Sequence, residues 1–420
     1  SVPFAFAMGG LILGKMDNEW VLTTRRWTLT AWYFLSAGLI LGGQWAYEEL
    51  GWGGFWAWDP VENAALMPWL TGTAFLHSVM IQEKRNMLKI WNVVLIILTF
   101  GLTIVGTFLT RSGIINSVHA FTQSEIGPAF LIFLAFILVI GFALLFKRIQ
   151  ILESEHKIES VLCRENAFLA QNVLLVGIAF TVLLGTTFPL LAEAVRGTKL
   201  SIQAPFFNTI IAPMGYMVLL LMGIGTLIAW RKSSWEGLRR NFKNPLILAT
   251  VGTVFLAWFL ADRNLLWSVH TIFWLTIFVT STIVLEIVKA VQAKSSQTKS
   301  NFIIVLFYVI ARNPRRYGGL LIHFGVVLMF LGFAGTFFKV ERNMTLEPGV
   351  PQQIGEYTLE FKQMEEFTVG NATHRASIVE VYDKEGDFLE VLKPAKSFYP
   401  TQPQPLTEVA IRRSFLEDLY

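Results

Sequence analysis

Long apolar segments alternate with short charged segments along most of the chain. Many of the apolar segments, at roughly 18 to 25 residues, are long enough to cross a hydrocarbon core of about 30 Å as helices. We expect full membrane spans at 28–46, 65–82, 91–110, 129–146, 167–191, 207–230, 246–260, 268–288 and 318–338. Residues 1–14 resemble the end of one more span. The pattern therefore predicts an all-α polytopic membrane protein with about ten transmembrane segments in this chain.

The pattern changes after Phe338. The remainder is polar, with alternating stretches such as "YTLEF" from Tyr357 and turn signals such as "DKEGD" from Asp383. We expect a small β-rich domain at 339–420 behind a transmembrane helical domain at 1–338. The stretch "NFIIVLFYVIARNPRR" from Asn301 is too short to span and ends in arginines, so we expect it to lie along the inner membrane surface.

Composition agrees with a membrane protein, since 54% of the 420 residues are hydrophobic, 15% are charged and the mean hydropathy is +0.52. The net charge of +4 arises in the loops and gives no reason to expect nucleic acid binding. Cys163 is the single cysteine, so the chain has no disulfide framework and no Cys-x-x-Cys-His motif for covalent haem attachment.

Basic residues concentrate in alternate loops, which fixes the expected orientation. One set of loops contains clusters that include Lys84, Arg85, Arg239, Arg240, Lys243, Arg312, Arg315 and Arg316. The intervening loops together contain only Arg111, Arg196, Lys199 and Arg263. The first set is therefore expected in the cytoplasm, which makes the β-rich domain and the loop at about 51–63 extracytoplasmic.

That loop, "WGGFWAWDPVEN" from Trp52 to Asn63, concentrates aromatic and acidic residues. Asp59, Pro60 and Glu62 occupy the N-cap, first and third positions expected at the start of a helix. The aromatic residues suit either an interfacial belt or a surface for a flat apolar ligand, of which haem is the obvious example. The haem surface would comprise Trp52, Phe55, Trp56, Trp58, Asp59, Glu62 and Asn63.

Two histidines are expected at one depth in the membrane. His77 lies about 25 Å inward from Pro60 and His323 about 8 Å into its span from the inner side, at about 1.5 Å per residue. Either alone would usually be a hydrogen-bonded packing residue, but the pair is what a bis-imidazole haem b between helices requires. Nearby basic residues could meet the haem propionates: Lys84, Arg85, Arg315 and Arg316.

The other four histidines differ in expected position. His119 lies in an external loop on the side of the tryptophans and is a candidate axial ligand for haem. His270 opens a span at about that level. His156, in a cytoplasmic loop, and His374, in the β-rich domain, are expected to be ordinary surface or packing residues.

Three stretches carry a resemblance: "WGGFWAWDPVENAALMPWLTGTAFLHS" from Trp52, "RSGIINSVHAF" from Arg111 and "RRYGGLLIHFGVVLM" from Arg315. In that order they resemble the CcmF family, the cytochrome c haem lyase subunit of bacterial system I maturation. The first resembles the tryptophan-rich WWD signature, which the related haem exporter and the system II synthetases share. The later histidine motif and the C-terminal domain favour CcmF.

The resemblance implies a function in the bacterial cytoplasmic (inner) membrane. His77 and His323 match the transmembrane ligands of a permanent haem b, and His119 matches an external haem ligand beside the WWD surface. The family receives substrate haem from a haem chaperone and forms thioether bonds with the Cys-x-x-Cys-His cysteines of apocytochrome c, which other subunits reduce and present. Quinol is the implied electron donor, and membrane lipid surrounds the spans.

The chain departs from the family in two places. The family has a further external histidine in an "HPP" motif before the equivalent of "SVPFAFAM", which begins here at Ser1, so we expect an upstream part. Phe55 stands where the family often has tryptophan, which keeps an apolar surface but removes an indole N–H.

Two other functions, a transporter and a respiratory cytochrome b, fit these residues less well. A transporter should bury polar groups along a path through the spans, but acids are few there and Glu286 lies near a span end. A respiratory cytochrome b usually has four histidines on two spans, and it would leave the aromatic loop without a purpose. Another WWD haem exporter or synthetase remains the main alternative.

Overall fold

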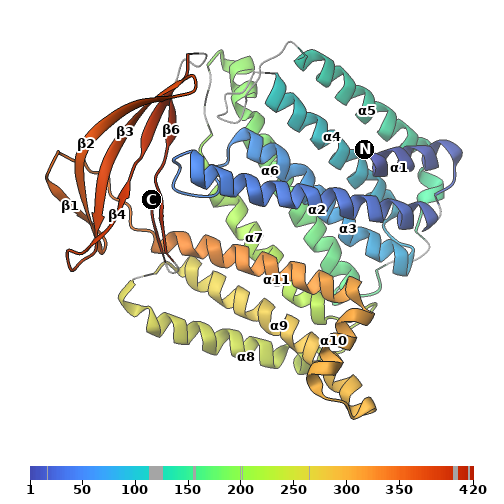
Figure 1. Cartoon of the computed structure of the whole chain (residues 1–420). Coiled ribbons are helices and arrows are strands. Elements are labelled where there is room, and N and C mark those ends of the chain that lie inside the picture. The colour runs from blue at the N-terminus through green and yellow to red at the C-terminus, as the bar shows by residue number, and fades with distance from the viewer. Residues whose placement is uncertain are drawn as a thin grey trace. The chain divides into compact units, whose positions relative to one another are not determined.

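The computed structural model describes residues 1–16, 18–112, 126–154, 158–198, 200, 202–263, 265–400, 405–414 and 417–420. These residues form two compact units, drawn in Figure 1. We call Ser1–Leu35 with Asn63–Phe337 the helical unit. We call Ser36–Glu62 with Phe338–Tyr420 the loop–sheet unit, because it joins the aromatic loop to the strands.

Helices make up almost all of the described secondary structure before Phe338. They are α1 (Val2–Leu13), α2 (Asn18–Glu49), α3 (Pro60–Arg85), α4 (Lys89–Arg111), α5 (Gly127–Lys147), η1 (Ile149–Leu152), α6 (Arg164–Arg196), α7 (Ala204–Leu227), α8 (Trp235–Phe259), η2 (Ala261–Arg263), α9 (Trp267–Thr298), α10 (Phe302–Arg312), α11 (Pro314–Gly335) and η3 (Thr336–Phe338). Among the described residues, eight helices are long and apolar enough to cross a membrane: α3 to α9, and α11 extended to Phe338. The predicted class of a multi-span helical membrane protein is confirmed.

The predicted spans from 65–82 onward coincide with these eight helices to within a few residues at most ends. The span predicted at 28–46 lies in α2, which is long but too polar to be among the eight. Residues 1–14 contain α1, a helix of 12 residues. The total number of membrane crossings therefore stays a prediction.

Helix α3 is the most enclosed of the eight candidate spans. Of its apolar window 61% is buried, against 11% for the peripheral α8. The indole N–H of Trp32 on α2 donates to Thr73 Oγ1 on α3 at 2.8 Å, and the Trp32 ring stacks on Trp69. Because α3 is central, other helices surround its side chains, including that of His77.

Neighbouring helices pack in pairs, with α4 beside α5 and α8 beside α9 (Figure 1). A core formed by α7, α9, α10 and α11 contains Leu219, Phe278, Val305 and Val327. The short helix α10 turns Val305 and Val309 into this core and exposes Phe302, Ile303 and Phe307. Its exposed apolar face is what the predicted position along a membrane surface requires.

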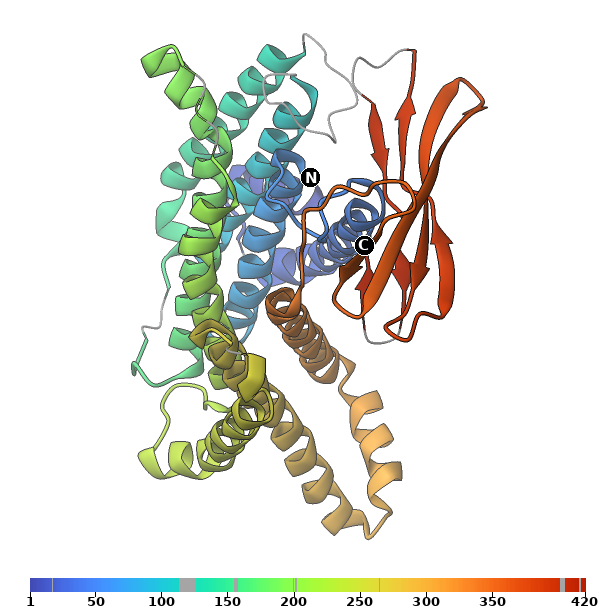
Figure 2. The same cartoon turned by 90° about the vertical axis from the view of Figure 1, so that its left-hand side faces the viewer.

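Antiparallel strands follow the helices, as the alternating sequence predicted. They are β1 (Pro351–Ile354), β2 (Tyr357–Val369), β3 (Ala372–Tyr382), β4 (Phe388–Leu392), β5 (Ala395–Phe398), β6 (Leu406–Glu408), β7 (Arg412–Arg413) and β8 (Asp418–Leu419). The main sheet has the order β1-β2-β3-β5-β6, with β4 on the other part of β3, and Figure 2 shows its curvature. Strands β7 and β8 pair separately. The expected β-rich C-terminal domain is confirmed.

Candidate functional site

His77 of α3 and His323 of α11 meet inside the helical unit. Their ring centroids are 6.2 Å apart, and their ring planes differ by 18°. His77 Nδ1 lies 2.9 Å from the carbonyl oxygen of Thr73, so this nitrogen donates and Nε2 keeps its lone pair. His323 Nδ1 is buried and makes no hydrogen bond within the described residues. Among the described residues, the pair thus includes one buried imidazole nitrogen, on His323, that no protein group satisfies.

The spacing of the two rings fits a metal between them. Each nitrogen that binds a metal lies about 2 Å from it, so two imidazoles on opposite sides of one ion have ring centroids roughly 6 Å apart. The hydrogen bond from His77 to Thr73 is the kind of outer contact that fixes the tautomer of a metal-binding histidine. These observations fit a haem iron held by His77 and His323.

Aromatic side chains continue from the histidine pair. Phe168 of α6 packs edge-on against His77, with ring centroids 5.6 Å apart. Trp230, just after α7, packs edge-on against Phe168 at 6.0 Å. Neither residue belongs to a sequence motif, so neither was predicted as part of the site. The row leads from the histidine pair to the ends of the helices where the basic residues gather.

Three of the four basic residues expected near haem propionates already contact acids. Arg85 pairs with Glu159 at 2.9 Å and with Glu165 at 3.3 Å. Arg315 pairs with Glu83 at 2.6 Å, an acid that also pairs with Arg25, and Arg316 pairs with Glu286. Arg231 and Arg85 hold the pKa of the Glu159 carboxyl below its usual range. The network joins the ends of α3, α6 and α11.

Lys84 is different, because it makes no ion pair among the described residues. Its Nζ lies 4.6 Å from the centroid of the Trp230 ring. Arg164 shares the same ring, with Cζ at 5.4 Å, and donates to the carbonyl oxygens of Ile228 and Thr226. Arg164 was not among the predicted residues, since only the packing of α6 brings it there.

The aromatic loop before α3 has an unusual backbone. Gly51 and Gly53 have φ of 66° and 63°, and Trp58 has φ of 60°. For a bulky residue this conformation costs about 1–2 kcal/mol. The rings of Trp56 and Trp58 lie edge to face, 5.8 Å apart at 90°. In this conformation the two indoles do not form one flat surface, so stacking both on a porphyrin face would require one ring to turn.

Asp59 and Glu62 form the capping arrangement that the sequence predicted. The backbone N–H of Val61 donates to Asp59 Oδ2 at 2.9 Å, and that of Asp59 donates to Glu62 Oε2 at 3.2 Å. Ala57 N–H donates to the same Glu62 oxygen at 3.1 Å. Both acids therefore fix the turn from the loop into α3, whatever contact they make with a ligand.

Tyr47, near the end of α2, connects the aromatic loop to the strands within the loop–sheet unit. Its ring stacks on Phe55 at 4.4 Å and lies 5.1 Å from the Tyr420 ring. Its hydroxyl donates to Asp418 Oδ2 at 2.9 Å, while Glu48 pairs with Arg413. Burial first, and then Asp418, raises the pKa of Tyr47 to about 12. The β7–β8 hairpin thus holds the base of the loop.

The remaining predicted residues differ in their contacts. Asn63 is 1% exposed and donates to Thr186 Oγ1 of α6 at 3.0 Å, an interhelical contact inside the helical unit. Trp52 is half-buried and Phe55 is exposed. His119 lies outside the described residues, as does His156. The positions of these two histidines stay predictions.

Two other histidines make ordinary contacts. His270 Nδ1 lies 3.1 Å from the carbonyl oxygen of Leu266, one turn earlier in the chain. His374 stacks on Phe367, and its Nδ1 lies 2.7 Å from Ser397 Oγ in the main sheet. Neither contact indicates a ligand site.

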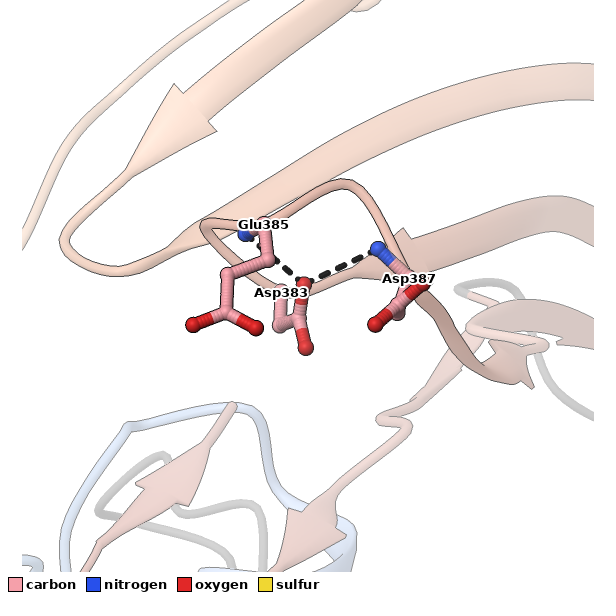
Figure 3. Close-up of side chains that lie close together, drawn as sticks. All are labelled: Asp383, Glu385 and Asp387. Carbon is pink, nitrogen blue, oxygen red and sulfur yellow. Dashed lines mark hydrogen bonds between the residues drawn. The ribbon is translucent and has the colours of Figure 1, made fainter.

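A cluster of acids in the β3–β4 turn is explained by the turn. Asp383 Oδ1 accepts the backbone N–H groups of Glu385 at 2.8 Å and Asp387 at 2.9 Å (Figure 3). The carboxylates of the three residues lie within 4.8 Å of one another, and those of Glu385 and Asp387 are exposed. Hydrogen bonds of this kind close the hairpin without a metal ion.

Comparison with known proteins covers the whole chain. The sequence family described as "Cytochrome C assembly protein" matches residues 11–115, and "CcmF C-terminal beta-sandwich" matches residues 337–420. The "Cytochrome c-type biogenesis protein CcmF" of Pseudomonas fluorescens is 37% identical over 423 residues, which cover 100% of this chain and 62% of that protein. Its Escherichia coli K12 counterpart is 36% identical over 430 residues, with the same coverage.

A solved structure named "Cytochrome c Heme Lyase CcmF" also matches. It has a TM-score of 0.79 and 32% sequence identity, and the match covers 99% of this chain and 62% of that chain. The chain thus spans about three fifths of the length of these relatives. The resemblance drawn from the sequence motifs is confirmed: over its whole length, the chain is similar to CcmF cytochrome c biogenesis proteins.

Proposed function

We propose that this chain is part of a cytochrome c haem lyase in the bacterial cytoplasmic membrane, with a haem b held between His77 and His323. The facing of these two rings at 6.2 Å, on helices far apart in the sequence, is the observation that supports the proposal most directly. Oriented histidines on separate helices are a usual way to bind haem within a helical bundle. The matched solved structure is named as a haem lyase.

The substrate haem is assigned to the other side of the membrane. We assign its binding to the aromatic loop, with Trp56 and Trp58 against the porphyrin once one of the two rings has turned, and with His119 as an iron ligand. A haem chaperone would deliver it, and partner subunits would present the reduced apocytochrome c. Each cysteine S–H adds across a haem vinyl double bond, so a thioether forms without an oxidant. The C-terminal strands belong on this outer side under the same orientation.

The haem b would supply one-electron chemistry, with quinol as the electron donor. The chain's own residues define its site: Thr73 fixes the tautomer of His77, and Phe168 packs against its ring. The transporter alternative loses its candidate carboxylate, because Glu286 is paired with Arg316. A WWD haem exporter or synthetase would use the same aromatic loop and is separated from a lyase by its product.

The test is the haem content of the purified full-length protein together with its product. A pyridine haemochrome spectrum should show haem b that acidified acetone extracts. Cells without the protein should lack covalent haem on apocytochrome c, and the full-length gene should restore it. Protein that contains no extractable haem would refute the haem b site, and unchanged cytochrome c in its absence would refute the lyase function.

A further inference from the structure

Lys84 and Arg164 form a pair of cations without a matching pair of anions. Both lie against the Trp230 ring, at 4.6 Å and 5.4 Å from its centroid. Among the described residues neither forms an ion pair. The acids that attract them are already paired: Glu83, near Lys84, with Arg315, and Glu165 and Glu286, near Arg164, with Arg85 and Arg316. A cation–π contact contributes about 0.5–1 kcal/mol at exposed sites, and two cations on one ring repel each other.

The positions of these cations relate them to the histidine pair. Lys84 lies two helical turns after His77 on α3, and Arg316 lies two turns before His323 on α11. Residues two turns apart share a helix face and are separated by roughly 10 Å along it. Lys84 is close enough to Arg164, Arg315 and Arg316 to be repelled by all three. The cations therefore converge on one side of the pair.

The row from His77 through Phe168 to Trp230 reaches the same place by a separate path. It places aromatic side chains beside the pair, in a row that ends at Lys84 and Arg164. A ligand that suits this arrangement has a flat apolar body at the imidazoles and two negative charges at one edge. A haem has that form, because both propionates project from one side of the macrocycle.

We propose that Lys84 and Arg164 bind the two propionate carboxylates of the haem held by His77 and His323. The proposal rests on the function proposed above and adds the residues that set the orientation of the haem. Arg85, Arg315 and Arg316 instead hold helix ends together through Glu159, Glu165, Glu83 and Glu286. The phosphate of an anionic lipid has the same charge chemistry, so the experiment must separate the two sources.

Comparing haem with haem dimethyl ester distinguishes propionate binding from lipid binding, because the ester has no carboxylates. Full-length protein freed of haem is titrated with each, followed by Soret absorbance. The wild type should bind haem more tightly than the ester by about tenfold for each charge-assisted pair. Lys84→Gln with Arg164→Gln should bind both forms equally and still show bis-histidine spectra. Lys243→Gln, a lysine on α8 outside this cluster, is the matched control and should keep the preference.

Equal binding of haem and its ester by the wild type would overturn the assignment, and this comparison needs no variant to fold. A preference that survives in the double variant would also overturn it. If the double variant weakens both forms alike and added phosphatidylglycerol binds only to the wild type, the cations bind lipid and the assignment is wrong. A wild type that binds neither form contradicts the haem b site itself.

Discussion

The ring of His77 lies 6.2 Å from the ring of His323 and nearly parallel to it, within 18°. Only the packing of α11 beside α3 produces this approach, because the two histidines are far apart in the sequence. His323 Nδ1 is buried and has no hydrogen-bond partner among the described residues, which is costly for a polar atom. The haem iron proposed above, bound by both imidazoles, would account for the arrangement.

Replacing Trp56 and Trp58 by alanine should weaken haem transfer while haem b stays bound. The two indoles are large apolar side chains of the loop, and their edge-to-face contact is lost when either is removed. The measurement is covalent haem on apocytochrome c beside the pyridine haemochrome of the purified protein. Normal cytochrome c yield from the double variant would mean that the tryptophans form only an interfacial belt.

Asp59→Ala should destabilise the start of α3 by about 0.5–2 kcal/mol, because it removes the acceptor for the Val61 N–H. Asp59→Asn is the matched control, since asparagine caps helices well but carries no charge. Thermal unfolding measures the effect of losing the cap, and cytochrome c yield measures the effect of losing the charge. If Asp59→Asn is stable but inactive, the carboxylate has a function beyond the cap.

Tyr47→Phe should destabilise the attachment of the aromatic loop by about 0.5–1.5 kcal/mol, because the hydrogen bond to Asp418 is lost while the stacking on Phe55 remains. We expect faster proteolysis in the loop and a lower unfolding temperature. Glu49→Gln, which changes an exposed neighbour, should leave both unchanged. Unaltered protease sensitivity in Tyr47→Phe would show that the hairpin does not hold the loop.

The pKa of Tyr47 adds a pH test. Since burial raises this pKa from 10.0 to about 12, the contribution of the neutral phenol is complete below pH 10 and is lost as the pH rises through about 12. Between about pH 10 and pH 12, the unfolding temperature should fall more steeply for the wild type than for Tyr47→Phe. If the unfolding temperature depends on pH in the same way in both proteins, Tyr47 is not the group that titrates.

The sequence predicted those features that depend on local order or on depth. Asp59 and Glu62 are close in the chain, so their cap was visible as a motif, and the structure contains it. His77 and His323 were paired from their distance to the membrane surfaces, and the structure brings them together. Both inferences need only helix geometry and the alternation of the loops.

Contacts between helices could not be predicted in this way. Phe168 reaches His77, and Trp230 and Arg164 continue the row, only because α6 packs against α3 and α7. Nothing in the local sequence of these residues marks them. Arg85 and Arg315 were expected near propionates from depth alone, which does not show the acids that pair with them. Tyr47 gave no signal, since its partner Asp418 lies at the other end of the chain.

The most direct test of the histidine site is rescue by imidazole. His77→Gly and His323→Gly in the full-length protein should each lose the bis-histidine spectrum of haem b, and added imidazole should restore it by filling the space of the missing side chain. His270→Gly should keep the spectrum without imidazole. If both variants retain an unchanged bis-histidine spectrum, His77 and His323 do not bind haem, and the proposed haem b site is wrong.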